Sequence, residues 1–219
     1  MQRTPEAELM DDPAQAQAYA QADFSEPHNH FIELLEQHGG ITAPGHVLDL
    51  GCGPGDICRR FARRFPDCHI HAVDAAEAML TLARSETVAQ GLDSCIEYFH
   101  GYLPEAQLPR RHYAFIMSNS LLHHLADPAV LWQACTAHGR PGTGVFIMDL
   151  MRPDSLEQAA HLQQTYAADE PEVLRQDFYN SLLAAYRPDE VRAQLAQQGL
   201  EQLQVEVVSD RHFIVHGRL

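Results

Sequence analysis

The sequence predicts an α/β fold in which helices cover both faces of a mostly parallel β-sheet. Three observations indicate this class. Strand-like and helix-like stretches alternate at short intervals from residue 46 to residue 150, as in βαβ units. The first strand-like stretch runs directly into a glycine-rich turn, and the chain ends on two strand-like stretches with almost nothing between them. A chain of 219 residues is long enough for one such domain with an insertion.

Five strands are expected before residue 151, each a short run rich in apolar residues. They cover residues 46–51, 69–74, 95–101, 113–120 and 144–150. Helical patterns fill three of the gaps, at 56–65, 75–90 and 128–138. Asp127 and Pro128 are expected to supply the N-cap and the first-turn proline of the third helix.

Two further strands, at 201–209 and 211–219, must form a hairpin because their connection is so short, so the final strand is antiparallel. The sheet is therefore Rossmann-like, with seven strands and helices on both faces.

One helical stretch precedes Gly39, and a longer insert follows the fifth strand up to Tyr186. Both would meet the C-terminal edge of the sheet, where open α/β sheets bind ligands. We expect a single domain, 1–219, whose parts are an N-terminal helical lid (1–38), a ligand-binding core (39–150), a helical insert or cap (151–187) and a C-terminal helix and hairpin (188–219).

Composition argues against several classes of partner. The formal net charge is −15 and all 15 basic residues are arginine, which argues against a surface for polyphosphates or nucleic acid. The run RRFARR at 59–64 is interpreted as a solvated helix face rather than a nucleic-acid contact. Five cysteines without a C-x-x-C pair favour reduced thiols, and the acidic N-terminus lacks signal-peptide features. No apolar stretch reaches membrane-spanning length, so we expect a cytoplasmic protein without membrane contact.

The glycine-rich stretch VLDLGCGPGD, residues 47–56, predicts a ligand site at the end of the first strand. A phosphate-binding loop would need G-K-[ST], which is absent. A dinucleotide fingerprint would place Asp56 at its third glycine, where Asp49 and Asp56 would face a pyrophosphate with like charge. S-adenosylmethionine (SAM) carries a sulfonium and an ammonium and no phosphate, so Asp49 can pair with its methionyl ammonium. Asp74 ends the next strand, 21 residues past Gly53, at the spacing where an acid binds ribose hydroxyls.

Four motifs in order resemble the class I SAM-dependent methyltransferases of the UbiE-like small-molecule type, the methyltransferase type 11-12 group. They are VLDLGCGPGD, HAVDAAEAML, FHGYLPEAQLP and FIMSNSLLHHLADP, within residues 30–150. The resemblance implies that SAM is bound and that S-adenosylhomocysteine (SAH) is the product. It assigns the methionyl part to Asp49, Gly51, Cys52 through its backbone, and Gly53, the ribose to Asp74, the adenine to Ala75 and Met79, and the amino-acid end to Asn119. The family often has Gly-Asp after its third strand, whereas this chain has Gly101-Tyr102, so Tyr102 is expected to cover the adenine instead.

The same loop supplies candidates for removing the acceptor's proton. SNSLLHHL stands where methyltransferases acting on DNA and RNA amino groups carry [DN]-P-P-[YFW], which argues against a nucleic-acid acceptor. His123 and His124 follow directly, and a histidine near neutral pKa can accept a proton. This segment resembles phosphoethanolamine methyltransferases, which pair such a histidine with a lid tyrosine, so His123 is preferred and Tyr19 is its partner. The alternative is a histidine that only caps or packs.

The insert and the tail supply candidate substrate contacts. These are Arg152, Tyr179, Asn180, Arg211 and His212. Two arginines near one opening would suit a carboxylate-bearing acceptor, although each alone is as well explained by a surface ion pair. Asp149 is the only clear carboxylate at the opening, and no H-E-x-x-H pattern occurs, so no metal is expected.

The expected function is therefore SAM-dependent methyl transfer to N, O or S of a small polar metabolite, with a carboxylate-bearing acceptor as one option. The enzyme would be a monomer or homodimer. A second interpretation keeps the reaction but assigns a tRNA or protein acceptor, contacted through residues 59–64. A third is a SAM-binding regulator without catalysis, because the motifs bind the cofactor and perform no chemistry themselves.

Overall fold

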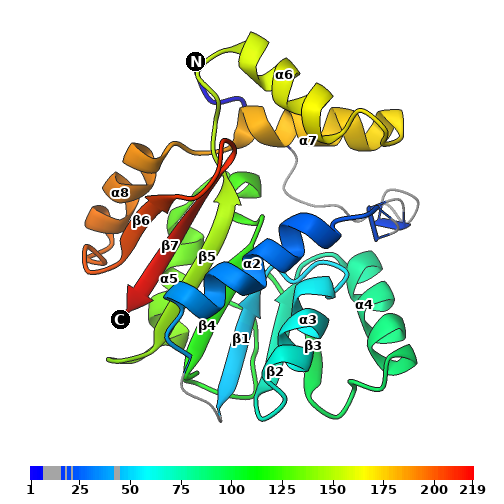
Figure 1. The fold of residues 1–219 in the computed structure, drawn as a ribbon. Coiled ribbons are helices and arrows are strands. Elements are labelled where there is room, and N and C mark those ends of the chain that lie inside the picture. Colours follow the sequence, from blue (N-terminus) through cyan, green and yellow to red (C-terminus); the bar gives the residue numbers. More distant parts are fainter. Residues whose placement is uncertain (7–15, 18, 21, 42–44) are drawn as a thin grey trace.

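The computed structural model describes residues 1–6, 16–17, 19–20, 22–41 and 45–219. A seven-stranded sheet with the order β3-β2-β1-β4-β5-β7-β6 forms its centre (Figure 1). The strands are β1 His46–Leu50, β2 His69–Asp74, β3 Ile96–His100, β4 Phe115–Asn119, β5 Gly144–Leu150, β6 Gln204–Val207 and β7 His212–Arg218. Strand β7 is antiparallel to β5 and β6, and the other pairings are parallel. The α/β class, the seven strands and the antiparallel last strand are confirmed.

Helices cover the two faces of the sheet in separate sets. On one face α2 Ser25–His38 and α3 Asp56–Arg64 pack with the start of α4 Glu77–Ala89. On the other face lie α5 Ala129–His138 and α8 Pro188–Gln197. The alternation along β1 explains the division, because Val47 faces the first set while Leu48 and Leu50 face the second.

Helix α2 is part of the core, although the sequence assigned it to a lid. Phe31 and Leu35 are fully buried in the cluster that also holds Phe61 of α3. The Phe31 ring packs edge-on against Phe146 of β5, with 5.1 Å between ring centroids. The apolar stripe of α2 therefore fixes it to the sheet. Part of the expected lid, residues 7–15, 18 and 21, lies outside the described residues.

The insert after β5 forms two helices above the C-terminal end of the sheet (Figure 1). Helices α6 Leu156–Tyr166 and α7 Glu172–Ala184 pack against each other, and Leu162 and Leu182 join Leu150 of β5 in a small apolar cluster. Residues 1–6 run beside them, since the backbone N–H of Thr4 donates to the Leu183 carbonyl at 3.0 Å. The cap thus includes the first residues of the chain.

Two expectations about the whole chain can be compared with this fold. All five cysteines are free thiols, as their spacing predicted. Within the described ranges, no helix has the length and apolar character needed to span a membrane.

Candidate functional site

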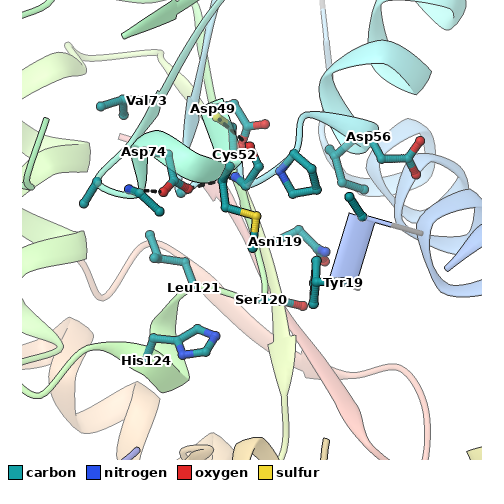
Figure 2. A pocket seen from close by; sticks show the side chains of 18 of the residues that line it. Tyr19, Asp49, Cys52, Asp56, Val73, Asp74, Asn119, Ser120, Leu121 and His124 are labelled. Carbon is teal, nitrogen blue, oxygen red and sulfur yellow. Dashed lines mark hydrogen bonds between the residues drawn. The ribbon is translucent and has the colours of Figure 1, made fainter. Parts of the chain in front are cut away.

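A cavity of about 910 Å³ opens at the C-terminal ends of β1, β2 and β4 (Figure 2). Its size suits a cofactor together with a small acceptor. Residues Asp49, Gly51, Cys52, Gly53, Asp74, Ala75, Met79, Gly101, Tyr102 and Asn119 all line it. The structure therefore brings together every residue that the sequence assigned to the cofactor.

The turn after β1 is shaped by glycines in the left-handed region. Gly51 has φ of +72° and Gly53 has φ of +50°, conformations that L-residues rarely adopt. A Cβ on Gly51 would lie 2.7 Å from the Leu121 side chain, whereas a Cβ on Gly53 would meet no atom within 4 Å. Because Gly53 lines the cavity, that open space is room for a ligand close to the backbone.

Asp74 connects β2 to this turn. Its Oδ2 accepts a hydrogen bond from the backbone N–H of Gly53 at 2.8 Å, and its Oδ1 accepts one from Ala76 at 2.8 Å (Figure 2). Burial raises the pKa of Asp74, and these backbone hydrogen bonds offset part of that effect. The carboxylate is held in one orientation at the cavity wall, as binding of a diol requires.

Asp49 is a buried carboxyl group whose hydrogen-bond donor is uncharged. It is 1% exposed, and its hydrogen-bond donor in the described part of the chain is the Cys58 thiol, at 2.9 Å. Burial raises the pKa of Asp49 to about 7, partly offset by the thiol. A buried acid that lines a cavity without a neighbouring cation suits a positively charged ligand. The ammonium and sulfonium of SAM meet this requirement, and the pyrophosphate of a dinucleotide does not.

The opposite wall supplies apolar surface and one strained residue. Met79 is buried and Tyr102 is 63% exposed at the rim, so the tyrosine is free to cover a planar group. Asn119 ends β4, and Ser120 follows it with φ of +55°, the only positive value for a non-glycine residue in the described ranges. Such strain concentrates at functional sites. No residue pattern around Ser120 predicts this conformation.

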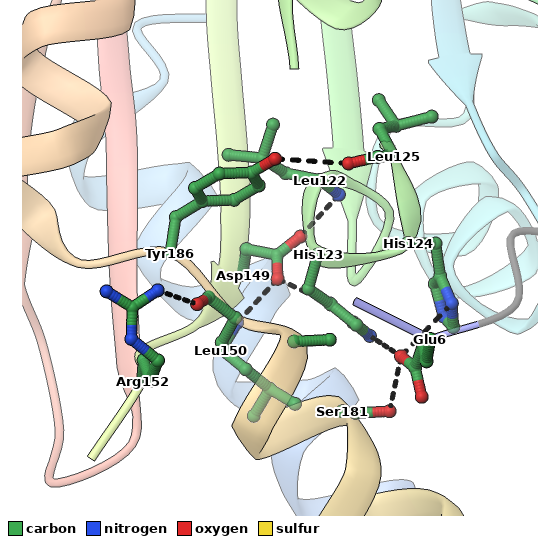
Figure 3. A network of polar contacts seen from close by, with 12 residues as sticks. Glu6, Leu122, His123, His124, Leu125, Asp149, Leu150, Arg152, Ser181 and Tyr186 are labelled. Carbon is green, nitrogen blue, oxygen red and sulfur yellow. Dashed lines mark hydrogen bonds and ion pairs between the residues drawn. The ribbon is translucent and has the colours of Figure 1, made fainter. Parts of the chain in front are cut away.

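Behind this wall lies a polar network centred on His123 (Figure 3). His123 Nδ1 is 2.6 Å from Asp149 Oδ1, and His123 Nε2 is 3.6 Å from Glu6 Oε1. Burial alone would lower the pKa of His123, but the charge and hydrogen bond of Asp149, together with Glu6, raise it. The pKa of Asp149 is lowered, since His123 and two backbone N–H groups outweigh burial. His123 is therefore held by Asp149 in a buried pair, and it is 2% exposed and outside the cavity lining.

His124 and Tyr19 face the cavity directly. His124 Nδ1 lies 3.3 Å from Glu6 Oε1, and its ring packs on His123 with centroids 4.2 Å apart. Burial, with Asp56 and Asp74 adding to it, raises the pKa of Tyr19 to about 12, so its hydroxyl stays protonated. Of the expected histidine and tyrosine pair, the structure thus brings Tyr19 and His124 to the cavity and leaves His123 behind it.

The five expected substrate contacts lie elsewhere. Arg152 donates to the Ala185 carbonyl at 3.0 Å and pairs with Glu190 at 2.5 Å. Arg211 stacks over the Tyr166 ring at 3.3 Å and pairs with Asp210. His212 is buried beside Ser209, and burial and Arg211 lower its pKa to about 3. Tyr179 and Asn180 belong to α7. None of the five lines the cavity. The two arginines instead bind partners in the cap, in α8 and in the hairpin.

The arginine run of α3 is also engaged within the protein. Arg59 donates to the Pro54 carbonyl at 2.7 Å, and Arg60 pairs with Asp56 at 2.7 Å. Arg63 and Arg64 pair with Gln90 and Glu36. Asp56 also accepts from His28 of α2 at 2.7 Å. These pairings hold the arginine side chains of α3 against neighbouring parts of the protein.

Several residues at the site were not among the sequence-based candidates. Glu6 reaches His123 from the chain's first residues, Asp149 had been considered only as a metal ligand, and His28 lines the cavity from α2. No sequence motif joins these positions to their partners. Glu6 lies 117 residues from His123, Asp149 lies 26 residues from His123, and His28 lies 28 residues from Asp56.

Comparisons with known proteins agree with this geometry. A family described as a methyltransferase domain matches residues 47–142. A ubiquinone biosynthesis O-methyltransferase of Acinetobacter baylyi is 31% identical over 122 residues, 55% of this chain and 50% of that protein. A trans-aconitate 2-methyltransferase of Yersinia pestis is 34% identical over 130 residues, 58% of this chain and 45% of that protein. The chain thus spans about half the length of these relatives.

A solved structure extends the likeness over nearly the whole fold. The SAM-dependent methyltransferase from Aquifex aeolicus superposes with a TM-score of 0.70 at 19% identity, covering 94% of this chain and 97% of that one. At that identity the match supports the architecture.

Proposed function

We propose that this chain is a class I SAM-dependent methyltransferase and that it transfers a methyl group to N, O or S of a small polar metabolite. The observation that carries the proposal is the pair of carboxylates beside the glycine turn. Asp49 offers a buried carboxyl group with no cation beside it among the described residues, and Asp74 offers a carboxylate oriented by two backbone N–H groups. Few ligands other than SAM combine a cationic amino-acid end with a ribose.

SAM, when bound, supplies an electrophilic methyl group on a sulfonium. The chain's part is to align the acceptor and to take up the proton that it loses. We assign the proton acceptor to His124, which faces the cavity, and a positioning role to His123, which Asp149 holds from behind. Tyr19 stays neutral at physiological pH and can donate a hydrogen bond to the acceptor.

The names of the relatives support a small-molecule acceptor, since one acts in ubiquinone biosynthesis and the other on trans-aconitate. The suggestion of a carboxylate-bearing acceptor loses its original support, because Arg152 and Arg211 are paired away from the cavity. We therefore propose a small polar acceptor without specifying its charge.

Methyl-labelled SAM tests the proposal. The protein is incubated with a cell extract separated into small molecules, RNA and protein, and label is counted in each fraction. We expect label in the small-molecule fraction, and Asp74→Ala should reduce it. Label confined to the RNA or the protein fraction would show that the acceptor is a macromolecule and not a small metabolite. SAH binding without transfer to any fraction would indicate a regulator.

A further inference from the structure

Far from the cavity, two histidines and a glutamate from three elements converge at the edge of the sheet. His38 is the last residue of α2, Glu206 lies on β6 and His216 lies on β7. His38 Nδ1 is 3.9 Å from Glu206 Oε2, and His216 Nε2 is 3.6 Å from the same oxygen. The three ligand atoms all lie within 4.8 Å of one another.

The sheet register explains why they meet. Glu206 pairs with Ile214 and Gln204 pairs with His216, so the glutamate and His216 are diagonal neighbours on one face. Ile214 belongs to the apolar cluster of Phe31 and Leu35, so this face is the one that α2 covers. The last turn of α2 then brings His38 over the strands, with the two imidazole centroids 4.7 Å apart.

The contacts within this cluster leave one buried nitrogen without a hydrogen bond. His216 Nε2 is buried and has no hydrogen-bond partner among the described residues, because 3.6 Å to the carboxylate exceeds hydrogen-bonding distance. An imidazole nitrogen without a hydrogen-bond partner, beside a second imidazole and a carboxylate, is a ligand set for transition metals.

We propose that His38, Glu206 and His216 bind a divalent transition-metal ion, with Zn²⁺ as the first candidate, and that the ion fastens the C-terminal end of α2 to β6 and β7. Zinc takes nitrogen and carboxylate ligands at about 2.0–2.2 Å, which in a tetrahedron places them roughly 3.4 Å apart. The glutamate oxygen, at 3.6 and 3.9 Å from the two histidine nitrogens, needs only a small adjustment, and all three ligand atoms lie within 4.8 Å of one another. Glu206 can supply it because its side chain is 53% exposed, and water can fill the fourth position.

The site has a structural consequence for the cavity. Helix α2 ends at the cluster with His38 and begins at the cavity, where Ser25 and His28 line the wall. An ion at one end of this helix would restrain the helix whose other end pairs with Asp56 of α3. The inference does not depend on the methyltransferase proposal, because it concerns metal binding alone.

Calorimetry of Zn²⁺ binding to tag-free, chelator-treated protein tests this inference. Glu206→Gln and His216→Ala should each weaken binding by about tenfold or more, while His161→Ala, at an exposed histidine of α6, should leave it unchanged. Zn²⁺ should also raise the melting temperature of the wild type by several degrees and not that of Glu206→Gln.

A second cluster serves as the competing explanation. Glu6, His123 and His124 also bring three ligand atoms within 4.8 Å. If Zn²⁺ binding survives Glu206→Gln and His216→Ala in folded protein but is lost in Glu6→Gln, the ion belongs there and the inference is overturned. Absence of Zn²⁺ binding to the wild type would overturn it equally.

Discussion

The carboxylate of Asp74 and the backbone N–H of Gly53 are joined by a 2.8 Å hydrogen bond across the mouth of the cavity. The acid that ends β2 therefore also holds the glycine turn that follows β1. One side chain thus organises two walls of the site before any ligand arrives, which lowers the ordering cost of binding.

Alanine substitutions at Gly51 and Gly53 should separate stability from binding. Both residues have positive φ, so each substitution costs about 1–2 kcal/mol of unfolding free energy. Gly51→Ala should cost more, because its Cβ would press on Leu121 at 2.7 Å. Gly53→Ala should fold but bind SAH weakly, since its methyl group enters the cavity. Urea unfolding measures the effect on stability, and calorimetry measures the effect on SAH binding. Equal SAH affinity for Gly53→Ala and the wild type would show that this turn does not contact the ligand.

SAH affinity should fall as the pH drops below about 7. Burial raises the pKa of Asp49 to about 7, so the free protein carries a neutral carboxyl group below that pH. Pairing with the ligand's ammonium requires the anion, so binding releases a proton and affinity decreases by up to roughly tenfold per pH unit. Asp49→Asn should bind more weakly at pH 8 and show no such decline. The ratio of the two affinities cancels the ligand's own titration, and a constant ratio from pH 5.5 to 8 would contradict the assignment.

The His123–Asp149 pair should stabilise the fold most between about pH 4 and 6.5. The folded pKa of His123 is raised, so its contribution is complete below the unfolded value of about 6.5 and is lost as the pH rises through the folded pKa. The folded pKa of Asp149 is lowered, so its contribution is present above about 3.9 and is lost on acidification. His123→Gln should cost roughly 3–5 kcal/mol of unfolding free energy near pH 6 and less at pH 9. Chemical denaturation across this range measures it, and a pH-independent cost would show that His123 is not charged.

The two neighbouring histidines should differ in catalysis once an acceptor is identified. His124→Ala should lower methyl transfer by roughly 10² to 10⁴ while leaving SAH affinity nearly unchanged, because the cofactor residues lie on β1 and β2. His123→Gln should lower transfer less and reduce stability. Initial rates with labelled SAM across pH provide the comparison. If His124→Ala keeps full activity, the acceptor arrives deprotonated or another group takes its proton.

The sheet was predictable because each strand carries its own short-range signal. Strands β2 and β5 have the expected bounds, and β1 differs by one residue at its end. The helices α3, α4 and α5 were also placed to within two residues. Helix α5 begins at Ala129, one residue later than predicted, so Asp127 stands one position before the N-cap and accepts from the Ala129 N–H at 2.9 Å. Helix α2 was assigned to a lid because its sequence precedes the first strand, and only its packing on Phe146 reveals a core helix.

The cofactor residues were predictable for a different reason: they fall in contiguous motifs at the ends of adjacent strands. The partners of long polar side chains are set by the tertiary structure instead. Arg152 could have reached an acceptor, but Glu190 of α8 lies beside it. His123 could have been a base at the cavity, but Asp149, one strand away, holds it in a buried pair behind the cavity wall. Glu6 reached both histidines only through the path of the N-terminal residues, which no motif encodes.

Calorimetric titration with SAH tests the central assignment most directly. The wild type should bind one SAH per chain. Asp74→Ala should weaken binding by about tenfold or more, because it removes charged hydrogen bonds worth roughly 1.5–3 kcal/mol. Asp67→Ala, at an exposed aspartate before β2, should bind as the wild type does. Failure of the folded wild type to bind SAH, or equal affinity in Asp74→Ala, would contradict the assignment of this cavity to SAM.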